Sequence, residues 1–210
     1  MTPSTCRADM ETQSIEFIDT EYKDQLLGLL RDKVFHVTTA KAFENIQKDG
    51  FIYGNQDAKY PLNPTSLNSF GRCNGWVCLF DLRGKSDKEI ENGLNCYYFL
   101  MPSWFKELNE SEHYTESRLV YLYLSHAYYK DLVPTREASE ARKNGKPSHS
   151  IPEVECWYPG NIPIGHIEKS LCVRIRHTFN LNHFVDKHTY MCLSADKTIP
   201  RVKRSKKDLL

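Results

Sequence analysis

Two glutamates, two positions apart, are the first candidates for chemistry in this chain. Glu153 and Glu155 lie in the segment 151–158, whose apolar and aromatic residues are typical of a strand. Because side chains alternate between the faces of a strand, we expect both carboxylates on one face, roughly 7 Å apart. A carboxylate on a rigid strand can stabilise an oxocarbenium-like transition state, as in glycosidic chemistry. The alternative is a solvated pair on an edge strand.

The second candidate site is His36 with Thr38, where a predicted strand at 34–37 leads into a helix. The two side chains lie on the same face of that strand. An imidazole and a hydroxyl placed in this way can form two hydrogen bonds to the diol of a sugar. The alternative is a histidine that serves only the local structure of the strand end.

Other kinds of site find little support in the sequence. His183 and His188 lie near Cys192, but their spacing matches no zinc pattern, so we predict no metal site. The chain contains no Gly-x-Ser-x-Gly sequence and no glycine-rich phosphate loop. These absences argue against a serine hydrolase and against the common nucleotide-binding loops.

Short helices and strands must position these residues. We expect one helix that begins after Asp19 or Thr20 and a second that runs from Thr38 or Thr39 to Gly50. Strands are predicted at 34–37, 51–53, 76–82, 97–100, 119–124, 151–158 and 171–176, and short helices or turns after Ser103, near 128–132 and at 162–167. Long polar segments, 54–75 and 135–150, separate some of them. The sequence therefore predicts a mixed α+β domain.

The two candidate sites together resemble those of the ADP-ribosyltransferase-like superfamily, most of all its bacterial and phage toxins and DNA-modifying enzymes. The resemblance rests on His-x-Thr at 36–38, followed by a helix that ends at Asp49-Gly50, and on Glu-x-Glu at 153–155, followed by Pro-Gly-x-Ile-Pro. It covers a minor part of the chain, 36–50 and 152–167. What it implies for the fold is a split mixed β-sheet core with small helices.

The resemblance also implies roles for the residues that match. His36 would bind a ribose of NAD, with Thr38 in support. Glu155 would hold the 2′-hydroxyl of the nicotinamide ribose and stabilise the cation that develops there. Glu153 would help to activate the acceptor, and the polar segment 135–150 would recognise the target.

Three further residues are candidates for NAD binding. Many relatives stack the nicotinamide ring on a tyrosine, and either Tyr53 or Tyr98 can take that role here. Arg72 is a candidate partner for the pyrophosphate on charge grounds alone. The sequence departs from some subfamilies, because it has His36 where they carry arginine and lacks a Ser-Thr-Ser motif in the strand 76–82.

The resemblance implies an NAD-dependent mono-ADP-ribosyltransferase, a glycosyltransferase that uses NAD as co-substrate. Its acceptor would be a protein side chain or a nucleic-acid base, or water in an NAD hydrolase, and the biological setting would be that of a toxin. Two alternatives stay open. One is an NAD-dependent RNA 2′-phosphotransferase of the same fold, and the other is a catalytically silent module that binds a nucleotide or nucleic acid.

Charge and cysteine content add context. The chain has 28 Lys and Arg against 27 Asp and Glu, so no overall field favours nucleic acid or a membrane. The basic segment 197–207 is either a solvated tail or an arm that contacts phosphates. Seven scattered cysteines without Cys-x-x-Cys, together with a polar N-terminus, suggest a cytoplasmic protein with reduced thiols. We expect a flexible lead (1–18), one catalytic domain (19–196) and a basic tail (197–210).

Overall fold

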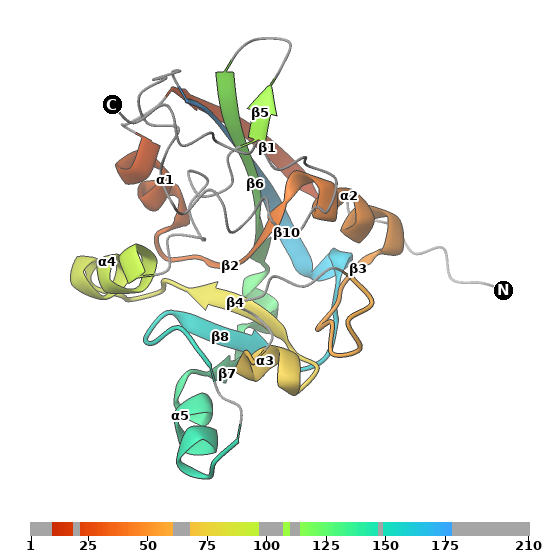
Figure 1. Cartoon of the computed structure of the whole chain (residues 1–210), viewed down its shortest axis with the longest axis vertical. Helices are drawn as coiled ribbons and strands as arrows, with labels where there is room; N and C mark the ends of the chain where they lie inside the picture. The colour runs from red at the N-terminus through yellow and green to blue at the C-terminus, as the bar shows by residue number, and fades with distance from the viewer. Residues whose placement is uncertain are drawn as a thin grey trace, which may run out of the picture. The chain divides into compact units, whose positions relative to one another are not determined.

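The computed structural model describes residues 10–18, 22–60, 68–96, 107–109, 114–146 and 149–177. All of them belong to one compact unit, Met1–Thr178. Within this described part, eight strands form one sheet and two more form a separate ribbon (Figure 1). The sheet strands are β1 (Glu11–Ile18), β2 (Val34–Thr39), β4 (Val77–Asp81), β5 (Glu107–Asn109), β6 (Tyr114–Leu124), β7 (Val133–Pro134), β8 (Glu155–Tyr158) and β10 (Ile167–His177).

The sheet has the order β1-β10-β6-β2-β4-β8-β7, and β5 pairs with β6 outside this path. β1 runs parallel to β10, whereas the other neighbours in the sheet are antiparallel. The separate ribbon pairs β3 (Phe51–Ile52) with β9 (Ile162–Pro163). The described fold is therefore mixed α+β with a mostly antiparallel sheet, as the sequence predicts at this level.

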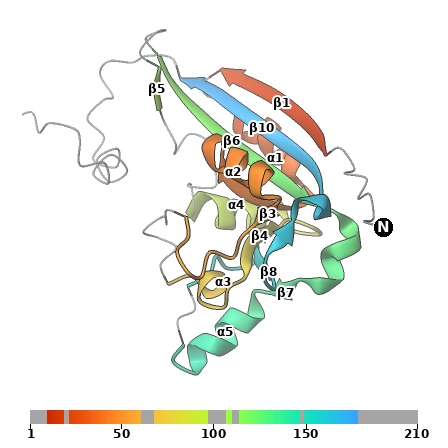
Figure 2. The same ribbon diagram turned by 90° about the vertical axis from the view of Figure 1, so that its right-hand side faces the viewer.

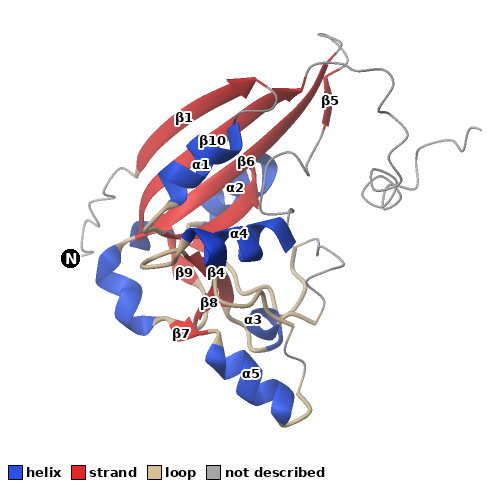
Figure 3. Cartoon of the chain, turned by 90° about the vertical axis from the view of Figure 1, so that its left-hand side faces the viewer, coloured by secondary structure: helices blue, strands red, loops and turns tan. Residues whose placement is uncertain are grey.

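Small helices cover both faces of the central strands. The α-helices are α1 (Tyr22–Leu30), α2 (Ala40–Asp49), α3 (Phe70–Cys73), α4 (Asp87–Cys96) and α5 (Arg136–Lys143), and the 3₁₀ helices are η4 (His126–Asp131) and η5 (Ile164–His166). α1 and α4 lie on one side of the central strands and α2 on the other (Figures 1 and 3). Figure 2 shows β1, β10 and β6 side by side, as their pairing requires.

Strand alternation divides the core between these two faces. On the face of α1 and α4, Phe35 packs against Phe80 and Tyr121, with ring centroids 5.9 and 5.7 Å apart. On the face of α2, Phe43 joins a cluster that includes Leu79 and Leu122. Because neighbouring residues of one strand supply opposite clusters, the central strands are buried on both sides.

The segment that follows His36 and Thr38 has the structure that its local signals predict. The side chain of Thr39 caps α2 by accepting a hydrogen bond from the backbone N–H of Ala42 at 3.2 Å. Gly50 ends the helix in the left-handed region, with φ of 75°, and its N–H donates to the carbonyl of Ile46. The expected strand, helix and stop are confirmed.

One expectation about the chain is corrected. The lead-in over 1–18 is wrong for residues 11–18, because they form β1, which adds to the edge of β10 and turns Ile15 and Phe17 toward the core. The polar segment 135–150, of which only a part could be helical, contains the helix α5. A helix at α4 was not expected at all.

Several expectations fall outside the described residues. These are the caps Asp19 and Thr20, the strand at 97–100, the helix after Ser103, the residues His183, His188 and Cys192, and the basic tail 197–210. In the part of the chain that is described, no helix has both the length and the apolar character to cross a bilayer.

Candidate functional site

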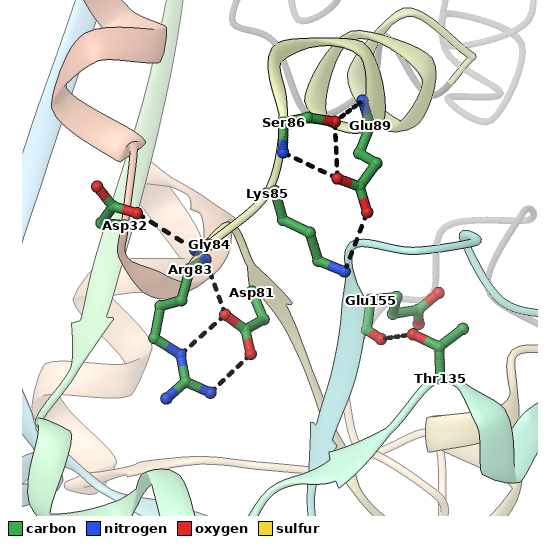
Figure 4. A network of polar contacts seen from close by, with 9 residues as sticks. All are labelled: Asp32, Asp81, Arg83, Gly84, Lys85, Ser86, Glu89, Thr135 and Glu155. Atoms are coloured by element: carbon green, nitrogen blue, oxygen red, sulfur yellow. Dashed lines mark hydrogen bonds and ion pairs between the residues drawn. The ribbon is translucent and has the colours of Figure 1, made fainter.

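Glu155 is the first residue of β8, and it stands opposite Phe80 of β4. The ladder begins just before it, where the N–H of Asp81 donates to the carbonyl of Val154 at 2.7 Å. Beyond β8 the short strand β7 completes this edge, and the hydroxyl of Thr135 donates to the backbone carbonyl of Glu155 (Figure 4). The backbone that carries Glu155 is thus held from both neighbouring strands.

The expected pairing of Glu153 with Glu155 on one strand face is wrong. Glu153 lies in a turn with φ of 68°, and the N–H of Val154 donates back to the carbonyl of Pro152 at 2.7 Å. This is a γ-turn with positive φ, which is rare and strained for a residue with a side chain. Pro152 has no N–H for a ladder, so the strand cannot extend back through it. Glu153 is therefore exposed and separate from the strand.

The carboxylate of Glu155 is buried, with 4% of the residue exposed. Its Oε1 accepts hydrogen bonds from the thiol of Cys78 and from the indole N–H of Trp157, both at 3.0 Å. Its Oε2 accepts from the backbone N–H of Ile151. Three neutral donors therefore fix the orientation of the carboxylate.

No lysine or arginine forms an ion pair with Glu155 among the residues that the structure describes. Burial raises the pKa of its carboxyl group above the ordinary value, and the bonds from Cys78, Ile151 and Trp157 oppose that rise. Burial of a carboxylate without a cation is unfavourable. A buried acid with a shifted pKa is a candidate for a functional site.

The helix α3 packs against the side chain of Trp157 and fixes its position. Its indole is fully buried and meets the ring of Phe70 edge-on, with centroids 4.7 Å apart. Gly71 lies so close that a Cβ there would stand 2.3 Å from Cδ1 and 2.8 Å from Nε1 of the indole. The absence of a side chain at Gly71 is what lets the indole N–H reach Glu155.

His36 lies where β2 separates from β4. The ladder between these strands contains only the pairs Val34–Asp81 and Phe35–Phe80. At the next position of β2 a side-chain hydrogen bond replaces the backbone pairing, because Nδ1 of His36 bonds to the carbonyl of Cys78 at 2.9 Å. Because a carbonyl only accepts, Nδ1 carries the proton and the neutral ring keeps Nε2 as an acceptor. Burial lowers the pKa of His36, which favours this neutral form.

Cys78 connects the two candidate sites. Its carbonyl bonds to His36 and its thiol to Glu155, on either side of one residue of β4. Strand alternation directs His36 to the face of Leu122, which stands opposite it on β6, and Glu155 to the face of Phe80. The two motif residues therefore approach the end of the β2–β4 ladder from opposite faces of the sheet.

Of the other predicted NAD-binding residues, Thr38 lies on the same face as His36, whereas Tyr53 and Arg72 contact other residues. Thr38 follows His36 on the same face, opposite Val120. Tyr53 stacks near Tyr60, with centroids 5.6 Å apart, and the ammonium of Lys59 lies 4.3 Å above its ring. Arg72 bonds to the carbonyl of Gln56 at 3.5 Å. Tyr98 lies outside the described residues.

Sequence reasoning missed Cys78, Trp157 and Thr135. Because side chains alternate along a strand, Trp157 is expected on the same face as Glu155, just as Glu153 is. The position of the indole could therefore have been predicted from the sequence. Nothing in the sequence places Cys78 or Thr135 beside the carboxylate, because both come from distant segments. In the described part of the chain, no three His, Cys, Asp or Glu side chains gather as they would around a metal ion.

Comparisons with protein-family models, with curated proteins and with solved structures found no significant match to this chain. A function for this chain must therefore be inferred from the geometry around Glu155 and from the resemblance of its motifs.

Proposed function

We propose that this chain is an NAD-dependent mono-ADP-ribosyltransferase of the ADP-ribosyltransferase-like fold, which modifies a protein or nucleic-acid acceptor. The observation that carries the proposal is the carboxylate of Glu155. It is buried, oriented by three neutral donors and linked through Cys78 to the histidine of the other motif. A fixed negative charge in a site of low dielectric suits a reaction that develops positive charge.

In this reaction the bond between the nicotinamide nitrogen and the anomeric carbon of its ribose breaks. Nicotinamide leaves with the bonding electrons, and the ribose ring develops oxocarbenium character. Glu155 stabilises this charge because no lysine or arginine of the described segments neutralises its carboxylate. The nucleophile of the acceptor then attacks the anomeric carbon and gives up its proton to solvent or to a base. With water as the acceptor, the same steps hydrolyse NAD.

NAD would lie across the point where the β2–β4 ladder ends. There the Nε2 of His36 can accept a hydrogen bond from a ribose hydroxyl, with Thr38 beside it. Oε1 of Glu155 accepts from two donors and Oε2 from one, so Oε2 has a further lone pair with which to accept from a ribose hydroxyl. Tyr53 and Arg72 remain candidates for the ring and the phosphates.

A cytoplasmic location accompanies this proposal. Cys73, Cys78, Cys156 and Cys172 are free thiols. The hydrogen bond from Cys78 to Glu155 requires a reduced sulfur, which a reducing compartment maintains.

One observation favours a second candidate, a catalytically silent module of the same fold. Glu155 is almost completely buried, and strand alternation directs it and His36 to opposite faces. If neither Cys78 nor Trp157 moves when a nucleotide binds, the charge stays out of reach of a ribose.

Nicotinamide release from labelled NAD separates the two candidates. Glu155→Gln keeps the shape of the side chain but removes the charge, so we expect the rate to fall roughly 100- to 1000-fold. Glu168→Gln, at an exposed position of β10, is the matched control and should release nicotinamide at the rate of the unmodified chain.

Two results would refute the enzyme. One is equal release by the unmodified chain and Glu155→Gln, and the other is no release with protein, nucleic-acid or water acceptors. If NAD nevertheless binds, detected by its effect on protein fluorescence, the second result supports the silent module.

A further inference from the structure

Cys78 is the second residue of β4, and two different groups of this residue face the two candidate sites. Its backbone carbonyl accepts from Nδ1 of His36 at 2.9 Å, and its thiol donates to Oε1 of Glu155 at 3.0 Å. Opposite Cys78 stands Trp157, whose indole donates to the same oxygen. The thiol and the indole, which lie on neighbouring strands, therefore both donate to one oxygen of the carboxylate.

The sulfur can act in this way only as a thiol. Burial raises the pKa of Cys78 well above its ordinary value, and the negative charge of Glu155 adds to the rise. Burial likewise raises the pKa of Cys156, the next residue along β8, and the charge of Asp81 adds to the rise. The side chain of Cys156 lies in the cluster on the other face. Through the neutral range both sulfurs keep their protons, and only Cys78 directs its proton to the carboxylate.

We infer that Cys78 is a positioning residue that couples the two halves of the proposed site, setting the tautomer of His36 through its carbonyl and the orientation of Glu155 through its thiol. This inference rests on the proposed function for its catalytic consequence. The hydrogen bond that Cys78 donates to Glu155 does not depend on any reaction.

The two hydrogen bonds of Cys78 come from its backbone and from its side chain, so a substitution can remove one and keep the other. Substitutions at position 78 keep the backbone carbonyl, so the bond to His36 should survive while the bond to Glu155 is lost. Cys78→Ala removes the donor, and Cys78→Ser replaces it with a hydroxyl of similar reach. Loss of a hydrogen bond to a charged group should lower kcat/KM for nicotinamide release roughly 10- to 100-fold.

The test combines two measurements on the full chain. Carboxyl ¹³C NMR, with the Glu155 signal identified by its loss in Glu155→Gln, follows the titration of Glu155 without NAD. Imidazole proton signals follow His36. We expect Cys78→Ala to move the pKa of Glu155 upward and to leave the titration of His36 unchanged, and Cys78→Ser to restore both the pKa and the rate.

Cys156→Ala is the matched control, because it removes the same atoms from a buried cysteine of the neighbouring strand. It should leave the titration of Glu155 close to that of the unmodified chain. An unchanged titration of Glu155 in Cys78→Ala would overturn the inference, whether or not the chain releases nicotinamide. A chain that releases none, but in which Cys78→Ala still shifts the Glu155 titration, would refute the proposed function and leave the hydrogen bond intact.

Discussion

The close approach of Gly71 to Trp157 leads to a prediction that tests how the site is built. In Gly71→Ala the new Cβ would stand 2.3 Å from Cδ1 and 2.8 Å from Nε1 of the indole. Ordinary van der Waals contact begins at 3.4 Å, so the indole must move by about 1 Å. That movement is opposed by Phe70, which packs against the indole with centroids 4.7 Å apart.

The expected magnitude follows from this overlap. Overpacking of a full core typically lowers the free energy of unfolding by about 1–3 kcal/mol. Helix propensity alone would favour alanine over glycine by about 1 kcal/mol, which offsets part of the loss. We therefore expect Gly71→Ala to destabilise the chain by up to about 2 kcal/mol and to raise the pKa of Glu155, because the displaced indole N–H no longer reaches Oε1.

Urea unfolding followed by circular dichroism measures the first effect, and carboxyl NMR the second. Gly28→Ala is the matched control, since Gly28 lies in α1 and a Cβ there would meet no atom within 4 Å. It should stabilise the chain by up to about 1 kcal/mol. If the two alanine variants unfold at the same urea concentration, the packing of Trp157 is not as described.

Two further predictions concern the same turn and strand. Glu153→Gly should raise the free energy of unfolding by about 1 kcal/mol, because glycine adopts a φ of 68° without strain; an equal or lower urea midpoint would contradict the γ-turn. The stability of the unmodified chain relative to Glu155→Gln should decline as the pH rises from near 4.5 through the folded-state pKa of Glu155. The stability declines because burial raises that pKa, so the folded state binds the proton more tightly than the unfolded chain. If the free energies of unfolding of the two chains change in parallel with pH, Glu155 is not buried in its charged form.

Much of the structure around His36 and Thr38 could be predicted because its signals are local. Thr39 and Gly50 mark the two ends of α2 through a hydroxyl cap and a left-handed glycine, which neighbouring residues suffice to define. β4, β6 and β10 were visible as apolar runs. β1 was not, because its polar residues give little sign of a strand until β10 provides an edge.

One local signal was present and missed. Ser86 and Glu89 form a capping box at the start of α4, in which the N–H of Ser86 donates to Oε2 of Glu89 at 2.8 Å and the N–H of Glu89 to the Ser86 hydroxyl at 3.3 Å (Figure 4). The sequence Ser-Asp-Lys-Glu displays this motif. The asparagines and the glycine later in the helix obscured it, since all have low helix propensity.

The site around Glu155 could be predicted only in part. Glu155 was identified as the candidate acid, but its surroundings depend on partners far away in the chain. The thiol of Cys78 lies 77 positions from Glu155, and no periodicity relates the two. Glu153 failed as its companion because Pro152 interrupts the strand, an effect that alternation alone does not capture.

The central claim is that Glu155 and His36 belong to one NAD site, and ¹⁵N-resolved NMR with added NAD tests it most directly. The chain has three tryptophans, so the indole N–H of Trp157 can be assigned with Trp157→Phe. We predict that NAD shifts this indole signal and the imidazole signals of His36 over the same range of NAD concentration. A shift in only one of the two, or in neither at millimolar NAD, would contradict the account.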